Sequence, residues 1–363
     1  MPVILSVSSL PLSHEVSQNL AMDFAKEMFG DSFKDLNRLL KLFENGQVKR
    51  RFFTRNLEWF KEEHTFEEKN DIYIDQAVEF GVEAVRKCLT HSEFLTRTVN
   101  ENEINAFIFV SSTGIATPTI DARIMNKLPF SRHTKRIPLW GLGCAGGASG
   151  LARAFEYCKA FPNSNVIVLT IELCSLTFQK NDVSKSNLVG TSLFGDGVAC
   201  ALVCGDESNL KGIKAKKYMP KILGTHSTLM SDSLDIMGWK VKNEGLYVIF
   251  SKDIPSIMKG WLLPNVKHFL KQFDLEKKDL SRFIAHPGGK KVLDAYQYEL
   301  GVTEEMLSYS KAVLHDFGNM SSATILYVLE RVMQDEVGIG EYGLAAALGP
   351  GFSSEMLLLK WEA

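Results

Sequence analysis

The chain of 363 residues lacks the features of several protein classes. It has no apolar run of about 18 or more residues, the length that a membrane-spanning helix requires. Its positive and negative charges nearly cancel, at a net charge of −2, and no basic stripe suggests a nucleic-acid-binding face. Residues 1–11 lack the basic segment of a signal peptide, so we expect a first strand to begin near residue 3. We therefore expect a cytoplasmic globular protein without nucleic acid or an integral membrane segment.

Cysteines are few and scattered, and the six of them show no paired spacing, such as C-x-x-C, that would hold a metal ion. Scattered cysteines fit a reducing compartment such as the cytoplasm. Five of them lie in largely apolar segments, where buried thiols are ordinary: Cys88, Cys158, Cys174, Cys200 and Cys204. The sixth, Cys144, has a different setting.

Cys144 lies in a glycine-dense turn, GLGCAGG (141–147), between an apolar segment at 136–140 and a segment at 148–160 with apolar residues at helical spacing. This pattern predicts a strand, a turn and a helix, with the thiol at the helix N-terminus. Unpaired backbone N–H groups and the helix dipole favour a thiolate there, and can lower a cysteine pKa from about 8.5 to about 3.5–7.5. Cys144 is thus a candidate nucleophile.

Two other interpretations of the turn are possible. Gly141, Gly143 and Gly146 match the G-x-G-x-x-G spacing of a dinucleotide-binding site. Against this interpretation, the acidic residue expected about 20 positions later is missing from the next apolar segment, 166–170. A glycine corner with a purely structural role is the other possibility, because short motifs also match by chance. The turn alone leaves all three interpretations open.

Two later segments offer the partners that a cysteine nucleophile needs, a base and a donor toward a developing oxyanion. His286 ends a short apolar segment and precedes Pro287, which forces His286 into an extended or turn conformation. Asn319 stands just ahead of a helical pattern at 323–333. Taken singly, His286 is also explained as a hydrogen-bonded turn residue and Asn319 as a helix cap.

Three motifs taken together, GLGCAGGASG (141–150), IAHPGG (284–289) and HDFGNMSSAT (315–324), resemble the chalcone synthase-like type III polyketide synthases. Further segments extend the resemblance over most of the chain: SLFGDGVA (192–199), EGLYVIFSKDIPSIM (244–258) and ALGPGFSSE (347–355). The resemblance implies an α/β fold of the duplicated, five-layered αβαβα thiolase type and, by analogy, a homodimer. The dinucleotide interpretation then loses most of its support.

The order of predicted strands and helices indicates two α/β halves without a disordered linker. We place the first half at residues 1–210, with the cysteine, and the second at residues 211–363, with the histidine and the asparagine. A site built from all three residues would then lie between the halves.

By resemblance, Cys144 carries the growing acyl chain as a thioester, and His286 and Asn319 bind the thioester carbonyl and promote decarboxylation of malonyl-CoA. Attack on the acyl-CoA and decarboxylation both build negative charge on an oxygen, so one pair of donors can serve both steps. No metal or other cofactor is then required beyond the CoA thioester substrates, because this pair of donors would stabilise both charges. Repeated condensation would end with a cyclised polyketide such as an alkylpyrone.

The implied cavity departs from the family pattern at several positions. Phe194 matches the first of two phenylalanines that usually stand between the CoA tunnel and the cavity, whereas Val248 replaces the second and removes a ring from this gate. Thr177 and Ser321 match other lining positions. Further lining positions carry residues that differ from plant enzymes or belong to the altered ALGPG motif: Cys174, Thr117, Leu348, Gly349 and Pro350. From Val248 and Leu348 we infer a long aliphatic starter, supplied as a fatty acyl-CoA.

A basic mouth is expected because acyl-CoA carries phosphates. Basic residues cluster near the N-terminus, at Arg38, Lys41, Lys49, Arg50, Arg51 and Arg55. The resemblance assigns CoA contacts to Arg38 and Lys41, and Lys290 is a further candidate. A solvated helix face followed by a charged turn explains the same cluster without CoA.

Three other functions remain open at this level. A ketoacyl-acyl-carrier-protein synthase III-like enzyme shares the fold and the cysteine, histidine and asparagine set, although the HPGG motif favours the polyketide synthase. A thioester hydrolase would use the same side chains with water as the acceptor. A catalytically silent acyl-CoA-binding protein would not need the full set of three residues.

Overall fold

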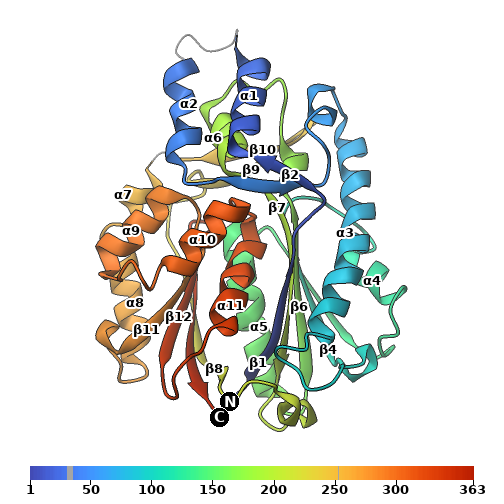
Figure 1. Cartoon of the computed structure of the whole chain (residues 1–363), viewed down its shortest axis with the longest axis vertical. Coiled ribbons are helices and arrows are strands. Elements are labelled where there is room, and N and C mark those ends of the chain that lie inside the picture. Colours follow the sequence, from blue (N-terminus) through green and yellow to red (C-terminus); the bar gives the residue numbers. More distant parts are fainter. Residues whose placement is uncertain (31–35, 252) are drawn as a thin grey trace.

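The computed structural model describes residues 1–30, 36–251 and 253–363, with the side chains of the second helix from residue 40 onward. In this part of the chain, nine strands form one mixed sheet in the order β11-β12-β13-β8-β1-β7-β6-β4-β5 (Figure 1). The strands of this sheet are β1 (Val3–Leu10), β4 (Ala106–Ser111), β5 (Lys135–Trp140), β6 (Asn165–Leu173), β7 (Asp196–Cys204), β8 (Met219–Leu229), β11 (Leu280–Ala285), β12 (Tyr342–Gly349) and β13 (Ser353–Glu362).

The sheet consists of two parts that meet between β1 and β8, where a single residue pair, Val3 with Lys221, is in register. Two helices, α5 (Gly146–Ala160) and α11 (Thr324–Gln334), pack between the two parts (Figure 1). The outer faces are covered by α3 (Phe66–Leu89) and α4 (Ile120–Met125) on one side and by α8 (Leu262–Lys271) and α9 (Lys290–Leu300) on the other. These five layers confirm the αβαβα fold expected from the resemblance.

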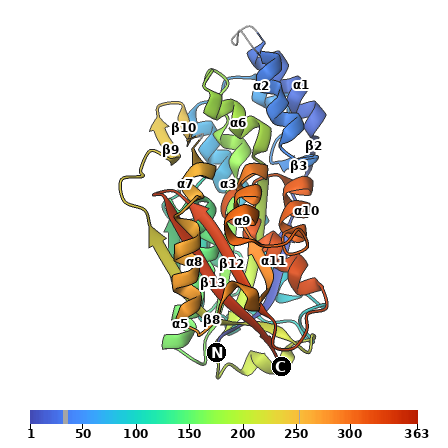
Figure 2. The same ribbon diagram turned by 90° about the vertical axis from the view of Figure 1, so that its left-hand side faces the viewer.

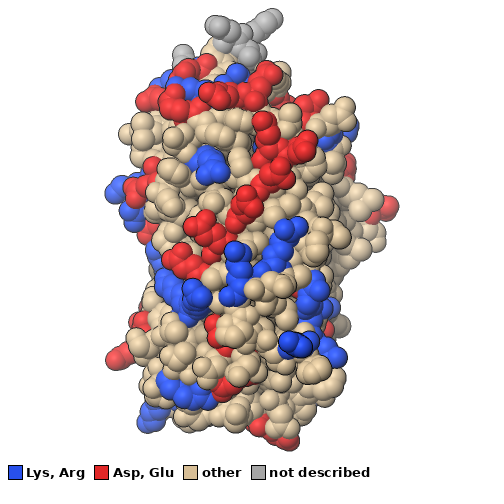
Figure 3. Space-filling view, turned by 90° about the vertical axis from the view of Figure 1, so that its right-hand side faces the viewer, with Lys and Arg blue, Asp and Glu red and all other residues tan. Residues whose placement is uncertain are grey.

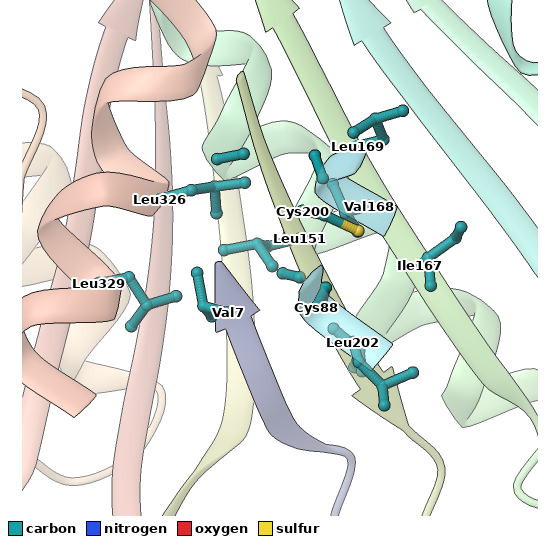
Figure 4. Packing of buried hydrophobic residues seen from close by; sticks show 14 of the residues in the cluster. Val7, Cys88, Leu151, Ile167, Val168, Leu169, Cys200, Leu202, Leu326 and Leu329 are labelled. Carbon is teal, nitrogen blue, oxygen red and sulfur yellow. The ribbon is translucent and has the colours of Figure 1, made fainter. Parts of the chain in front are cut away.

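Burial on both faces explains the composition of the central strands. All nine residues of β6 are buried, in keeping with its nearly continuous apolar sequence. Helix α5 can approach this strand closely because Gly150 has no side chain. A Cβ atom at this position would come within 2.7 Å of Val168. Figure 4 shows the packing of this core, with Cys88 and Cys200 among the apolar side chains. The two thiols are therefore ordinary core residues, as predicted.

A smaller assembly covers one end of the layers (Figure 2). It contains two two-stranded sheets, β2 (His14–Ser17) with β3 (Arg50–Phe53) and β9 (Met237–Lys242) with β10 (Gly245–Phe250). The helices of this end are α1 (Gln18–Phe29), α2 (Leu36–Asn45), α6 (Lys185–Leu193) and α7 (Ile254–Met258), and α10 (Ser308–Phe317) lies beneath them. The basic cluster and the predicted gate residues both fall in this end.

Charges of both signs occur on the face that α3 occupies (Figure 3). Exposed acidic residues follow one another at four-residue spacing along α3, at Glu67, Asp71, Asp75, Glu79 and Glu83, and Arg86 and Lys87 follow them in its last turn. The start of α3 is secured by a capping box between Thr65 and Glu68. Within the described residues, no helix is both long and apolar enough to cross a membrane.

Candidate active site

Cys144 lies in a short helical turn, η3 (Gly143–Ala145), between β5 and α5, which confirms the predicted strand, turn and helix. Gly141 and Gly143 adopt left-handed backbone conformations, at φ values of 86° and 48°, which suit glycine. A Cβ atom on Gly143 would also lie 2.8 Å from Pro350. The glycines of this motif therefore shape the turn and its packing, and they leave the Cys144 side chain 8 % exposed.

Asn319 faces Cys144 from the segment between α10 and α11. Both atoms of its carboxamide, Oδ1 and Nδ2, lie 3.9 Å from the Cys144 Sγ. The amide is held on both sides, because Nδ2 donates to the Gly288 carbonyl at 3.2 Å and Oδ1 accepts from the Ser321 N–H at 2.8 Å. Its orientation toward the thiol therefore follows from hydrogen bonds and is not free to change.

His286 joins this cluster from the end of β11, where its backbone N–H donates to the Ala346 carbonyl at 2.9 Å. The bond from Asn319 to Gly288 ties the histidine segment to the asparagine. His286 is buried, and neither ring nitrogen has a hydrogen-bond partner within the described part of the chain. A buried imidazole without a partner leaves a donor and an acceptor unused in the protein alone.

Burial determines the protonation of both groups. It raises the pKa of the Cys144 thiol to about 11, against the opposing effect of hydrogen bonds from Ser321 and Asn319. It also lowers the pKa of His286 to about 3. The expectation of a lowered cysteine pKa was therefore wrong for the protein alone, because loss of water around the thiolate outweighs the helix terminus. At neutral pH the pair consists of a thiol and a neutral imidazole.

A buried carboxylate near the thiol was missed by the sequence analysis. Glu172 of β6 accepts hydrogen bonds from the backbone and hydroxyl of Ser112 at 3.1 and 3.0 Å, from Thr113 at 2.9 Å and from Ser322 at 2.6 Å. Its negative charge raises the Cys144 pKa further. An acidic residue inside an otherwise apolar strand was the available signal, because a buried charge needs such partners.

Four predicted cavity residues line one mostly apolar pocket, which we call the Phe178 pocket. Its walls include the predicted residues Cys174, Thr177, Phe194 and Val248 and the rings of Phe24, Phe53, Phe60 and Phe178. Cys174 is buried directly after β6, and Thr177 donates to its carbonyl at 2.7 Å. The structure therefore brings these four residues together beside an apolar space.

The predicted gate region contains more aromatic rings than the loss of one at position 248 suggested. Val248 pairs with Trp239 across the β9–β10 hairpin, so the two side chains lie on the same face. The Trp239 and Phe250 rings lie 6.1 and 5.5 Å from the Phe194 ring. Val248 supplies no ring, but Trp239 on the neighbouring strand places one beside it. Only the register of the hairpin identifies Trp239 as this residue.

The remaining predicted cavity residues occupy different surroundings. Ser321 has a left-handed backbone, at a φ of 49°, and donates its N–H to Asn319. Gly349 packs against the turn of Cys144, since a Cβ atom there would lie 2.6 Å from Ala145. Leu348 is buried in an apolar cluster that includes Leu344 and Phe352. Thr117 is exposed and precedes a cis proline, and the described contacts do not connect it to the cluster.

The predicted CoA-binding cations are only partly placed. Lys41 is exposed on α2, and Lys290 begins α9 just after the HPGG segment, where it pairs with Asp294 at 2.8 Å. The side chain of Arg38 lies outside the described residues. Of the neighbouring cluster, Lys49 is exposed and Arg50 pairs with Glu15 at 3.3 Å.

Arg51 contradicts its assignment to the basic mouth. Its side chain is fully buried, so it cannot present its charge to a phosphate at the surface. Alternation along β3 is the physical reason, since neighbouring residues of a strand point to opposite sides.

Among the described residues, no group of three or more potential metal ligands is found.

Comparisons with known proteins agree with this arrangement. Residues 16–207 match the N-terminal domain of chalcone and stilbene synthases, and residues 222–361 match their C-terminal domain. The chain is 53 % identical to the Bacillus subtilis protein named "Putative chalcone synthase", over 100 % of this chain and 99 % of that protein. It is 30 % identical to 1,3,6,8-tetrahydroxynaphthalene synthase of Streptomyces coelicolor, over 96 % of this chain and 89 % of that enzyme.

Solved structures give the same result. The crystal structure of the tetrahydroxynaphthalene synthase of Streptomyces coelicolor, a bacterial type III polyketide synthase, superposes with a TM-score of 0.90 at 28 % identity. That superposition covers 99 % of both chains.

Proposed function

Because this chain belongs to the chalcone and stilbene synthase family of type III polyketide synthases, which are acyl-transferring condensing enzymes, we propose that it extends a fatty acyl-CoA starter with malonyl-CoA on Cys144. The observation that carries this proposal is the 3.9 Å approach of Asn319 to the Cys144 Sγ, together with the hydrogen bond from Asn319 to Gly288, two residues beyond the buried His286. The mostly apolar walls of the Phe178 pocket, which include Phe194, support an apolar substrate.

Loading begins with a thiol, because Cys144 is protonated at neutral pH in the protein alone. As the Sγ attacks the acyl-CoA carbonyl, His286 accepts the thiol proton, and the carbonyl electrons move to the oxygen. We propose that the Asn319 Nδ2–H group, whose nitrogen lies 3.9 Å from the Sγ, stabilises that oxyanion. When the carbonyl re-forms, the C–S bond to CoA breaks and the departing CoA sulfur takes the proton from His286. The acyl group is then held on Cys144.

Extension uses the same donors. When malonyl-CoA loses carbon dioxide, the electrons of the broken C–C bond pass to the thioester oxygen as an enolate. Asn319 and the N–H of neutral His286 can both donate to that oxygen. The enolate carbon then attacks the Cys144 thioester, a C–C bond forms and the Cys144 thiolate leaves. Transfer of the extended chain back to Cys144 repeats the cycle until the chain cyclises, for which we propose an alkylpyrone.

A long aliphatic starter is supported by the walls of the Phe178 pocket, which are mostly apolar and largely aromatic. The β9–β10 hairpin forms one side, and it is fastened by a hydrogen bond of 3.2 Å from the Gln179 amide to the Leu246 carbonyl. We propose that Trp239, Val248 and Phe194 together limit which acyl chains enter. Lys41 and Lys290 are proposed to contact the CoA phosphates.

We further propose a homodimer that works in the cytoplasm, with a division between the halves near residue 210. The six cysteines are free thiols, which fits a reducing compartment. At the end of the large sheet, β5 has only β4 beside it among the described strands, and this edge supports a subunit interface.

The decisive experiment is mass spectrometry of products formed from isotope-labelled malonyl-CoA and a series of short, medium and long acyl-CoA starters. Wild-type protein is expected to form chain-extended pyrones that contain label, and folded Cys144→Ala is expected to form none. Free fatty acid without labelled product would instead indicate a thioester hydrolase. Extension only from acyl-carrier-protein substrates would indicate a ketoacyl-acyl-carrier-protein synthase III-like enzyme.

Starter selection is tested by competition between acyl-CoA lengths. Val248→Phe adds a ring opposite Trp239 and is expected to shift the preference toward shorter chains, and Trp239→Ala is expected to shift it toward longer ones. Unchanged length profiles in both variants would remove the gate from the proposal while leaving the condensing activity intact.

A further inference from the structure

Arg51 is a buried cation whose described partners include no carboxylate. Its Nη1 donates to the carbonyls of Thr191 at 2.7 Å and Phe194 at 3.2 Å, and its Nη2 donates to the Ser192 carbonyl at 2.8 Å and to the Gln18 side chain. A charge taken fully out of water is expensive unless it has strong partners. Three of its four partners are backbone carbonyls of one short segment, 191–194, which indicates that the charge serves that segment.

The segment is the C-terminal end of α6. The last carbonyls of a helix have no partner within the helix and carry the negative end of its dipole. A guanidinium suits this end because its planar set of donors can reach several carbonyls at once. Arg51 therefore caps the C-terminus of α6 and also donates to the carbonyl of Phe194, the first residue beyond the helix.

Asn319 is attached to the same backbone. Its N–H donates to the Leu193 carbonyl at 2.9 Å, and its carbonyl accepts from the Gly195 N–H at 3.0 Å, so residues 193–195 and 319 form a small bridge. Both backbone segments of this bridge pack against the Cβ atom of Arg51. A Cβ atom on Gly195 would lie 3.1 Å from the Arg51 Cβ, and one on Gly318 would lie 3.7 Å from it.

We propose that Arg51 is a positioning residue that sets the location of both Phe194 and Asn319 relative to Cys144, by closing α6 from the neighbouring strand β3. The chain of contacts runs from the guanidinium to residues 191–194, from Leu193 and Gly195 to the Asn319 backbone, and from the Asn319 amide to the Cys144 sulfur. Arg51 touches no reacting atom itself. Its effect on catalysis rests on the proposed function, but its effect on Asn319 does not.

The test is the rate at which iodoacetamide alkylates Cys144, followed by peptide mass spectrometry at pH 8. The hydrogen bond from Asn319 lowers the Cys144 pKa, so its loss reduces the reactive thiolate. Asn319→Ala is expected to slow alkylation about threefold to tenfold, because the thiolate loses a hydrogen bond that favours it. Arg51→Met is expected to reproduce that slowing, and Arg51→Lys to show a smaller one. The matched control is Arg50→Met, which changes a neighbouring half-exposed arginine and is expected to leave the rate unchanged.

Circular dichroism establishes which variants are folded, and Arg51→Lys carries the test where Arg51→Met is unfolded. A folded Arg51 variant with wild-type or faster alkylation overturns the proposal, as does slowing of equal size in Arg50→Met. In turnover assays, Arg51→Lys is expected to lower kcat about tenfold or more with KM for malonyl-CoA within about threefold, since a positioning residue acts after binding. Wild-type protein without any turnover would contradict the proposed function and not the role of Arg51, which the alkylation series decides independently.

Discussion

At the scale of single residues, the two reactive side chains, Cys144 and His286, are both neutral at pH 7. The Cys144 thiol and the His286 ring are both taken out of water, and burial moves their pKa values in opposite directions, upward to about 11 and downward to about 3. A thiolate and an imidazolium therefore do not form in the protein alone. In the proposed mechanism, proton transfer from sulfur to nitrogen therefore accompanies the attack on the thioester, and Asn319 stabilises the oxyanion formed there.

The raised thiol pKa predicts a steep pH dependence of alkylation. Well below its pKa, the thiolate fraction rises about tenfold for each pH unit. The rate of Cys144 alkylation by iodoacetamide should therefore still be increasing between pH 8 and pH 9.5, as peptide mass spectrometry at a series of pH values can show. A rate that levels off below pH 8 would contradict this prediction and would restore the lowered pKa expected from the helix terminus.

His286 predicts a loss of stability in acid. Its pKa falls from 6.5 to about 3 on folding, so between these values the unfolded chain binds a proton that the folded chain does not. Its contribution is present above pH 6.5 and is lost as the pH falls, by up to about 1.4 kcal/mol of unfolding free energy per pH unit. Urea unfolding of folded His286→Gln at pH 7.5, 6.5 and 5.5 should show a smaller loss toward acid than wild type.

Asp196 is the natural control because its sign is opposite. Burial raises its pKa from 3.8 to about 7, so its contribution is present below pH 3.8 and is lost as the pH rises through 7. Asp196→Asn should therefore increase the loss of unfolding free energy that occurs as the pH falls, whereas His286→Gln should reduce that loss. Parallel curves for wild type and His286→Gln would show that the imidazole does not titrate as inferred.

At the scale of elements, the position of Cys144 depends on how closely α5 approaches α11. Gly147 in the first turn of α5 leaves no room for a side chain, because a Cβ atom there would lie 2.2 Å from the Ser322 carbonyl and 2.7 Å from Ile325. The contact joins the helix behind the cysteine to the segment that follows Asn319. Any residue larger than glycine must push these two elements apart.

Gly147→Ala is expected to lower the free energy of unfolding by about 1–3 kcal/mol, the usual cost of overpacking a core. It should also reduce turnover, because Asn319 moves away from the thiol. Gly212→Ala is the matched control, since nothing lies within 4 Å of a Cβ atom at that position. Equal denaturant midpoints for the two variants would show that α5 and α11 can adjust without cost.

At the scale of the whole molecule, the sheet ends at β5 in an open edge. Pro138 within this strand has no N–H to donate, so we expect side chains and not strand pairing to dominate any interface there. Trp140 and Ile115, 51 % and 45 % exposed, are large apolar residues near that edge, and Trp140 donates to the Gly114 carbonyl at 3.0 Å. Such an edge suits a symmetric interface between two copies of the chain.

Light scattering after size exclusion should therefore give twice the 40.6 kDa of one chain for the wild type. Trp140→Glu is expected to shift the equilibrium toward the single chain, because a carboxylate would be buried without a partner. Tyr298→Glu changes a residue that is 79 % exposed on α9 and should leave the mass unchanged. A wild-type protein of one chain mass, or a Trp140→Glu dimer of unchanged affinity, would place the interface elsewhere or remove it.

The amino-acid sequence by itself determined the local settings of the three central residues. Glycines at 141 and 143 predicted the turn of Cys144, proline at 287 predicted the turn that follows His286, and apolar spacing predicted the helix after Asn319. These features depend on neighbours a few residues apart, so they can be recognised from the sequence. The division of the chain near residue 210 and the starter chain length stay predictions.

Only the tertiary structure decided how these segments meet and what surrounds them. Cys144 meets a residue 175 positions away, Glu172 meets Ser322 across 150 positions, and Arg51 reaches Phe194 across 143 positions. Burial, which arises from such distant contacts, turned Arg51 from an expected surface cation into a helix cap and kept the Cys144 thiol protonated. Solvent exclusion at Arg51 and Cys144 is a property of the packed molecule, and for that reason the local sequence around these two residues did not reveal it.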